Sequence, residues 1–144
     1  MKSLISAVLF ACFAMTAYGQ QTVNVKDQQE LRQLQSIVAT NAGITVSAVK
    51  RVELLDLGNG RFYLLGSASL DNGNSISVGT EVQNKGGKGG GGWLPVGYKI
   101  TCKGYHCSEC NIRGFPNIND LYCECDRKID ENSRCDMEKT IGVN

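Results

Sequence analysis

Three cysteines and the only histidine of the chain lie within the nine-residue segment Cys102–Cys110. The spacing C-x4-C-x2-C begins the ligand set of plant-type iron–sulfur proteins, and a C-x2-C pair beside a histidine is also typical of zinc sites and of thiol redox enzymes. Each of these sites requires a different structural feature elsewhere in the chain. An iron–sulfur cluster needs a fourth thiolate, zinc needs four converging ligands, and a redox C-x2-C pair needs the start of a helix.

The first residues of the chain predict export. They contain one basic residue, Lys2, then the apolar run Leu4–Ala14, and they end on the small residues Ala17 and Gly19, which is the pattern of a cleaved secretory signal. The apolar run is shorter than the roughly 20 residues that a helix needs to cross a bilayer. We therefore expect removal of residues 1–19, no membrane span, and a secreted or periplasmic protein.

Export changes the meaning of the cysteines. One of the seven, Cys12, leaves with the signal, and an even number in one short segment of an exported chain indicates a framework of about three disulfides. The candidates for disulfide formation are Cys102, Cys107, Cys110, Cys123, Cys125 and Cys135. Their pairing stays open, because six cysteines allow many connectivities.

The competing chemistries fit an exported chain less well. An iron–sulfur cluster would have to be loaded outside the cytoplasm, and Gly114 and Pro116 would end any helix that a redox C-x2-C pair needs. A metal-binding tail for zinc or copper, built on Cys107, Cys110 and His106, remains the alternative to disulfides. The main interpretation has no catalysis and no cofactor.

The charge of the chain is balanced. It has fifteen basic and fourteen acidic residues, and loss of Lys2 leaves fourteen of each sign. A nucleic-acid-binding surface needs a basic excess or a basic stripe, and attraction to anionic membranes needs the same. The sequence therefore disfavours both, and it predicts a protein or surface partner outside the cytoplasm while leaving the oligomeric state open.

Ahead of the tail cysteines, residues 20–83 have the periodicity of a small packed unit. Asp27–Glu30 has the form of a helix cap, and apolar side chains then follow at helical spacing until Asn41–Gly43. The period then changes to two, in three strand-like runs separated by the turn sequences Gly58–Gly60 and Asp71–Gly73. The predicted fold class is α+β, with one N-terminal helix packed on a three-stranded antiparallel meander. The residues expected on its opposite, solvated face are Tyr63, Ser67, Ser69, Ser75, Ser77 and Glu81.

Glycines divide the mature chain. Residues 84–92 include a run of six glycines in seven positions, which predicts a flexible linker because glycine has a high ordering cost and no side chain to bury. Beyond it, residues 93–144 contain few large aliphatic side chains. We expect this segment to be a small irregular tail held by the disulfides.

The tail order CKGYHCSEC, then CEC, then a last cysteine followed by aspartate, resembles a recurrent tail of small exported cysteine-rich proteins of Gram-negative bacteria, whose function is unassigned. The resemblance implies export and a compact cysteine-rich tail, and it brings no ligand or catalytic residue. The helix-and-meander order resembles cystatin and PepSY-type units, some of which bind proteases. The expected function is a small exported binding or structural protein, and the alternatives are a metal-binding tail and a protease-inhibitor-like interaction module on the meander.

Overall fold

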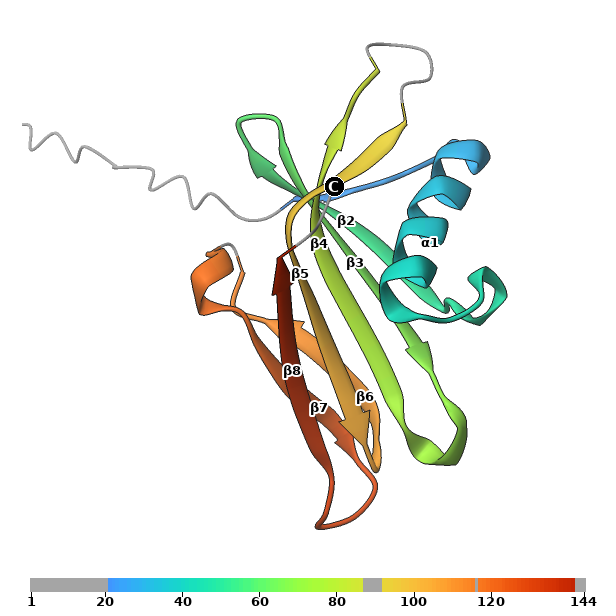
Figure 1. Ribbon diagram of the computed structural model, residues 1–144, viewed down its shortest axis with the longest axis vertical. Coiled ribbons are helices and arrows are strands. Elements are labelled where there is room, and N and C mark those ends of the chain that lie inside the picture. Colours follow the sequence, from blue (N-terminus) through green and yellow to red (C-terminus); the bar gives the residue numbers. More distant parts are fainter. Residues whose placement is uncertain (1–20, 87–91, 116, 142–144) are drawn as a thin grey trace, which may run out of the picture.

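The computed structural model describes residues 21–86, 92–115 and 117–141 (Figure 1). The predicted signal, residues 1–19, and the central glycines of the predicted linker lie outside the described residues. Removal of the signal therefore stays a prediction.

The described chain consists mainly of β-strands, in two antiparallel sheets. The larger sheet has the order β1-β2-β3-β4-β5-β8, and β6 pairs with β7 in the smaller one. The strands are β1 (Gln21–Val23), β2 (Arg51–Gly58), β3 (Arg61–Ser69), β4 (Ser75–Asn84), β5 (Trp93–Tyr105), β6 (Cys107–Arg113), β7 (Tyr122–Lys128) and β8 (Arg134–Ile141). The helical elements are α1 (Gln28–Ala42) and three short 3₁₀ turns, Val46–Ala48, Asp71–Gly73 and Ile118–Asp120.

Helix α1 begins and ends where the sequence predicts. The Asp27 carboxylate accepts hydrogen bonds from the backbone N–H groups of Gln29 and Glu30, at 2.8 and 2.9 Å. These contacts satisfy two of the amides that a helix start leaves without a partner. Gly43 ends the helix in a left-handed conformation, φ 68°, that carries no steric penalty for glycine.

The helix covers one face of the larger sheet. Its buried side chains Leu34 and Val38 pack against alternate residues of the central strands. Gly66 of β3 permits the close approach, because a methyl group there would lie within 3 Å of the Val38 side chain. The core on this side consists of Leu34, Val38, Leu54, Leu64, Ala68, Ile76, Val78, Val82 and Trp93.

The fold class expected from the sequence is wrong, because 57% of the described residues are in strands and the sheet does not end at the third strand of the meander. Strand β5 pairs with β4 on the far side of the glycine run, from Asn84 opposite Trp93 to Ser75 opposite Gly104. Trp93 is only 8% exposed in the helix-side core, where its indole N–H donates to the Glu30 carboxylate at 2.7 Å. The segment expected to be an irregular tail thus supplies four strands, and two of them extend the main sheet.

The opposite face of the sheet is also covered, by the β6–β7 hairpin, so α1 and this hairpin lie on either side of the sheet (Figure 1). Tyr63, Ser75 and Ser77, which were expected to be solvated, are 1%, 4% and 6% exposed. The serines can be buried because β6 supplies hydrogen-bond partners and because their small side chains let it approach closely. The core on this side consists of Leu55, Tyr63, Ile100, Cys102, Cys107, Cys110, Ile112 and Leu121.

Candidate functional site

Three disulfides use all six predicted cysteines, and two of them fasten the hairpin to the main sheet. Cys102 of β5 is bonded to Cys123 of β7, and Cys110 of β6 is bonded to Cys135 of β8, so each of these bonds joins the two sheets. The third bond, from Cys107 to Cys125, joins β6 to β7 within the hairpin. The expected framework of about three disulfides is confirmed, and it suggests an oxidising environment of the extracellular or periplasmic kind.

The cysteine spacings follow from strand geometry. The pairing of β6 with β7 shifts in register on both sides of Glu109, and this irregularity brings Cys107 and Cys110 to the same buried side although they are three residues apart. In β7, Cys123 and Cys125 share one side because residues two apart in a strand face the same way. Both cysteine pairs therefore face the main sheet, which includes β8.

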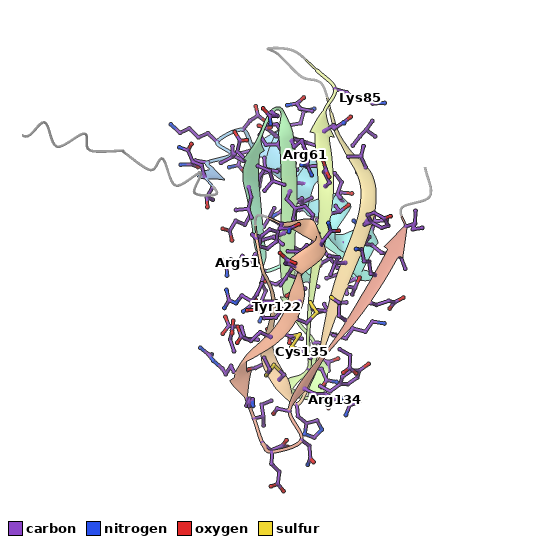
Figure 2. All side chains as sticks on the ribbon, turned by 90° about the vertical axis from the view of Figure 1, so that its left-hand side faces the viewer. Arg51, Arg61, Lys85, Tyr122, Arg134 and Cys135 are labelled. Carbon is purple, nitrogen blue, oxygen red and sulfur yellow. A yellow bond between two sulfur atoms is a disulfide. The ribbon has the colours of Figure 1, made fainter. Side chains whose placement is uncertain are left out.

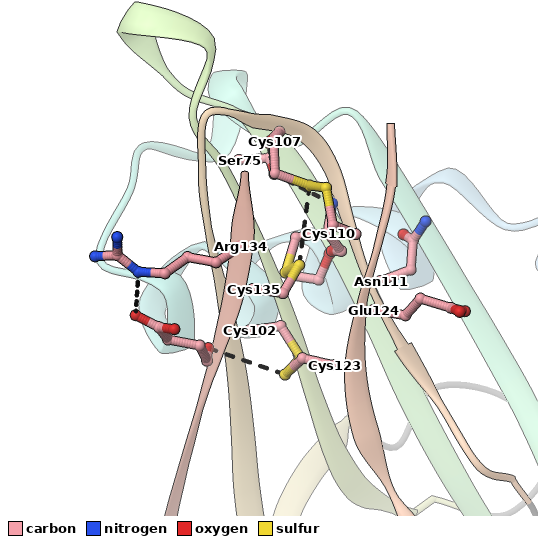
Figure 3. The surroundings of a disulfide bond; sticks show 12 residues. Ser75, Cys102, Cys107, Cys110, Asn111, Cys123, Glu124, Arg134 and Cys135 are labelled. Atoms are coloured by element: carbon pink, nitrogen blue, oxygen red, sulfur yellow. Dashed lines mark hydrogen bonds and ion pairs between the residues drawn. A yellow bond between two sulfur atoms is a disulfide. The ribbon is translucent and has the colours of Figure 1, made fainter. Parts of the chain in front are cut away.

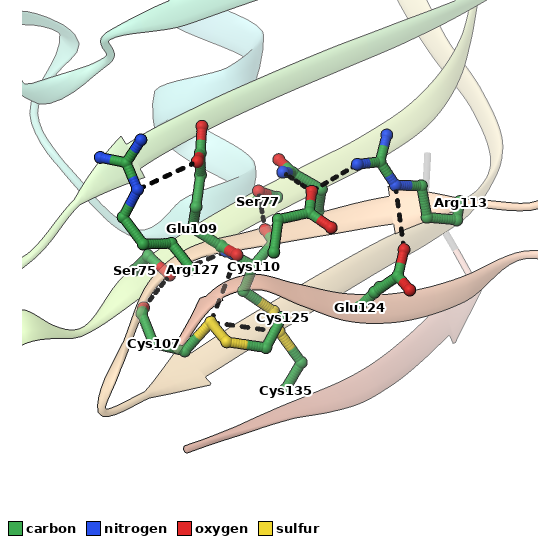
Figure 4. Close-up of polar contacts among 12 residues, drawn as sticks. Ser75, Ser77, Cys107, Glu109, Cys110, Arg113, Glu124, Cys125, Arg127 and Cys135 are labelled. Carbon is green, nitrogen blue, oxygen red and sulfur yellow. Dashed lines mark hydrogen bonds and ion pairs between the residues drawn. A yellow bond between two sulfur atoms is a disulfide. The ribbon is translucent and has the colours of Figure 1, made fainter. Parts of the chain in front are cut away.

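Four of the six sulfur atoms form a compact group, which we call the sulfur cluster: those of Cys107, Cys110, Cys125 and Cys135 (Figures 3 and 4). The Sγ atoms of Cys107 and Cys135, which belong to different disulfides, are 3.9 Å apart. Those of Cys107, Cys125 and Cys135 all lie within 4.8 Å of one another. Cys107 and Cys110 are buried, whereas Cys125 and Cys135 are half-buried.

Backbone and hydroxyl groups hold the buried side of the sulfur cluster. The hydroxyl of Ser75 donates to the carbonyl of Cys107 at 2.6 Å and accepts from the N–H of Cys110 at 3.2 Å. The Ser77 hydroxyl donates to the carbonyl of Cys110 (Figure 4). These contacts hold β6 on β4 at the level of the cluster.

His106, a candidate metal ligand, forms the turn between β5 and β6. It has a left-handed backbone, φ 49°, and its N–H donates to the Asn74 side chain at 3.1 Å. Its exposed ring lies 2.7 Å, Nδ1 to Oδ2, from Asp130, and this hydrogen bond lowers the pKa of the Asp130 carboxyl. The structure thus places the predicted ligands Cys107 and Cys110 beside Cys125 and Cys135. The third predicted ligand, His106, is hydrogen-bonded to Asp130 instead.

A groove of about 340 Å³ lies beside the hairpin, on the face of β2 and β3 that β6 and β7 leave open. Leu55, Leu65, Ile112 and Phe115 form its apolar part. The polar residues around them are Arg51, Glu53, Ser67, Ser77, Asn111 and Arg113, with Gly66 and Gly114 between. Figure 2 views the molecule from the hairpin side and shows Arg51 beside the hairpin.

Phe115 is one of the apolar residues that line the groove. Its ring packs against Tyr63 at 5.2 Å between centroids, inclined by 62°. Gly114 makes the turn that places Phe115 there, with φ 98°, and a side chain on it would collide with the Asp120 backbone. The Tyr63 hydroxyl lacks a hydrogen-bond partner among the described residues, and burial, followed by the charge of Glu81, raises the pKa of Tyr63 so that the phenol stays protonated.

Two arginines border the groove, and each is held by acidic residues of the same surface. Arg51 contacts the Glu53 carboxylate at 2.7 Å and is 64% exposed. Arg113 contacts Glu124 at 3.3 Å and also Asp126 (Figure 4). A guanidinium has five N–H donors, so these contacts leave donors that can meet an added carboxylate or sulfonate.

The groove was not predicted, because the alternation along the strands favoured a solvated face of the sheet. One local signal pointed to a second covering layer: Leu54–Leu55 and Leu64–Leu65 place adjacent leucines on both faces of a strand, as in strands that are covered on both sides. The inhibitor-like module depended on a helix packed on a three-stranded meander, in the order that resembles cystatins. We do not propose it, because the meander is part of a six-stranded sheet.

Comparison with protein-family models, with curated proteins and with solved structures finds no match to this chain. Within residues 21–86, 92–115 and 117–141, no helix is both long enough and apolar enough to cross a bilayer.

Proposed function

We propose that the protein is an exported binding protein whose groove takes a small anion with an apolar body. The observation that carries this proposal is the groove itself, which four apolar side chains line together with Arg51 and Arg113. Its volume of about 340 Å³ is near the lower end for small-molecule sites. A single ring system or a branched aliphatic group, carrying one carboxylate or sulfonate, is the class of ligand that matches it.

The arginines can turn to such a ligand at little cost. An exposed ion pair contributes only about 0–1 kcal/mol to stability. Arg51 can therefore exchange Glu53 for the anionic group of a ligand with little loss of stability. The same lining favours binding over catalysis. Among the described residues that line the groove none is a histidine, cysteine or lysine, and the Ser77 hydroxyl already donates to a backbone carbonyl.

The test uses 8-anilinonaphthalene-1-sulfonate, which combines an aromatic body with one anionic group, as the probe. We expect saturable fluorescence enhancement with one site per chain. Ser67→Trp should abolish it by filling the groove, and Ser69→Trp, two residues along the same face of β3 and outside the groove, is the matched control. Enhancement that Ser67→Trp leaves unchanged would contradict the proposal.

The anionic requirement is tested separately. Arg51→Gln and Arg113→Gln should each weaken binding of the sulfonate probe several-fold, because each removes a charged donor at the rim. Lys128→Gln removes an exposed charge from a residue that does not line the groove, and it should leave binding unchanged. The uncharged probe N-phenyl-1-naphthylamine should bind more weakly than the sulfonate and should not respond to either arginine variant.

A further inference from the structure

Three members of the sulfur cluster, Cys107, Cys125 and Cys135, lie close enough together to share one metal ion. The members of the cluster come from three strands, Cys107 and Cys110 from β6, Cys125 from β7 and Cys135 from β8. We infer that reduction of the two disulfides Cys107–Cys125 and Cys110–Cys135 produces a four-cysteine site for a zinc-like divalent cation. The third disulfide, Cys102–Cys123, stays outside this site.

The distances support this assignment. Zinc bound to four thiolates has Zn–S bonds of about 2.3 Å in a tetrahedron, which places neighbouring sulfurs about 3.8 Å apart. Cys107 and Cys135 already stand 3.9 Å apart without a bond between them, and Cys125 lies within 4.8 Å of both. Cys110, which is bonded to Cys135, supplies the fourth sulfur; it lies outside the group that shares the 4.8 Å limit, so it has to shift toward Cys107 or Cys125. After reduction, the two formerly bonded pairs have to move apart by just under about 2 Å, and the remaining sulfur pairs have to close to the same spacing.

The redox step balances with a dithiol as the reductant. A thiolate of the dithiol attacks the sulfur of the half-buried Cys125, the bond to Cys107 breaks, and Cys107 leaves as a thiolate. The second thiol of the reductant then attacks the mixed disulfide, which releases Cys125 and forms the reductant's own disulfide. The same two steps at Cys135 release Cys110. Two dithiols thus supply four electrons and four protons, the cation binds four thiolates, and the four protons go to solvent.

Two features keep the strands in place after reduction. The pairings of β6 with β7 and of β8 with β5 need no disulfide, and the Ser75 and Ser77 hydrogen bonds still hold β6 on β4. This ligand set differs from the one that the sequence suggested, since Cys125 and Cys135 take part and His106 does not.

The experiment is a cobalt(II) titration of the purified protein, reduced and handled under argon, because tetrahedral cobalt–thiolate coordination has visible bands that report the ligands. We expect one cobalt per chain, bands typical of four thiolates, and displacement of cobalt by zinc with loss of the bands. Cys125→Ser and Cys135→Ser should each change the spectrum and lower the affinity for cobalt at least tenfold. Oxidation should restore the disulfides and release the metal.

Matched controls distinguish this four-cysteine site from metal binding elsewhere in the chain. The double variant Cys102→Ser with Cys123→Ser, and the variant His106→Ala, should both keep the tetrathiolate spectrum. Far-ultraviolet circular dichroism follows the strands throughout, and if the reduced chain unfolds, added zinc should restore its β signal. The inference is overturned if the reduced protein gives no thiolate bands and no metal-dependent β signal, or if the bands depend on Cys102, Cys123 or His106. It does not depend on the groove, because none of the described residues that line the groove is a cysteine.

Discussion

Ser75 satisfies two buried backbone groups of β6 with one hydroxyl, the carbonyl of Cys107 and the N–H of Cys110. Ser75→Ala leaves both without this partner, so we expect a loss of about 1–3 kcal/mol in the free energy of unfolding. Urea denaturation measures it. Ser69→Ala, at an exposed position of β3, is the control and should stay within about 0.5 kcal/mol of the parent protein. Equal effects of the two changes would mean that the buried contacts contribute little.

Asp130 gives the protein an acid-sensitive contact. The hydrogen bond with His106 lowers the pKa of the Asp130 carboxyl in the folded chain. The contact therefore stabilises the fold at pH values above the carboxyl's ordinary pKa, and this contribution is lost as the pH falls through the lowered value. In His106→Ala the pKa of Asp130 should rise back toward its ordinary range, which NMR titration of the carboxyl can follow. An unchanged titration would show that the ring does not act on the carboxylate.

Single residues were predictable from the sequence where their partners are local. Asp27 and Gly43 were identified as helix signals because a cap depends on residues within one turn. The burial of Ser77 could not be predicted, since its partner Cys110 is 33 residues away and belongs to a different sheet. A serine on a strand looks the same in the sequence whether it faces water or a backbone carbonyl.

Among the elements, β8 depends most on one covalent bond. If the Cys110–Cys135 bridge is removed, the shortest remaining covalent path between the two positions uses the Cys107–Cys125 bridge. This path runs over three residues from Cys110 to Cys107 and over ten from Cys125 to Cys135. If the Cys102–Cys123 bridge is removed, the corresponding path runs over five residues from Cys102 to Cys107 and over two from Cys125 to Cys123. The first bridge therefore closes the longer effective loop.

Loop entropy turns this difference into a ranking. Replacing both Cys110 and Cys135 by alanine should cost about 3 kcal/mol, against about 2.4 kcal/mol for Cys102 and Cys123. It should also increase amide hydrogen exchange in β8 more than in β2, because β8 then keeps only its pairing with β5. Calorimetry and hydrogen exchange measure the two effects. The reverse ranking would indicate that strain in the folded state outweighs loop entropy.

The sequence predicted the first elements well and the later ones poorly. The helix and the three strands β2, β3 and β4 are present near their expected positions, since their periodicities and turn residues are local signals. Strands β5 to β8 were missed because glycines, prolines and closely spaced cysteines interrupt their alternation. Gly97 and Gly104 in β5, and the irregular register of β6, are examples.

For the molecule as a whole, the structure predicts that residues 21–84 do not form a cooperative unit alone. This fragment would lack Trp93 from the helix-side core and would expose Tyr63 and the edge of β4. We expect no sharp urea transition and little amide protection in the fragment, in contrast to the full chain. A cooperative transition in the fragment would instead support the two-part organisation that the glycine run suggested.

The arrangement of the disulfides also sets how the protein responds to a pulling force. Tension applied at the two ends can draw out the chain before Cys102 and after Cys135, at up to about 3.6 Å per residue. Between these positions the load passes through the bridges and the short stretches 102–110 and 123–125, so that residues 111–122 and 126–134 bear no tension. The disulfides thus make the segment from Cys102 to Cys135 almost inextensible. A reducing agent would remove this limit, so the molecule would lengthen under the same load.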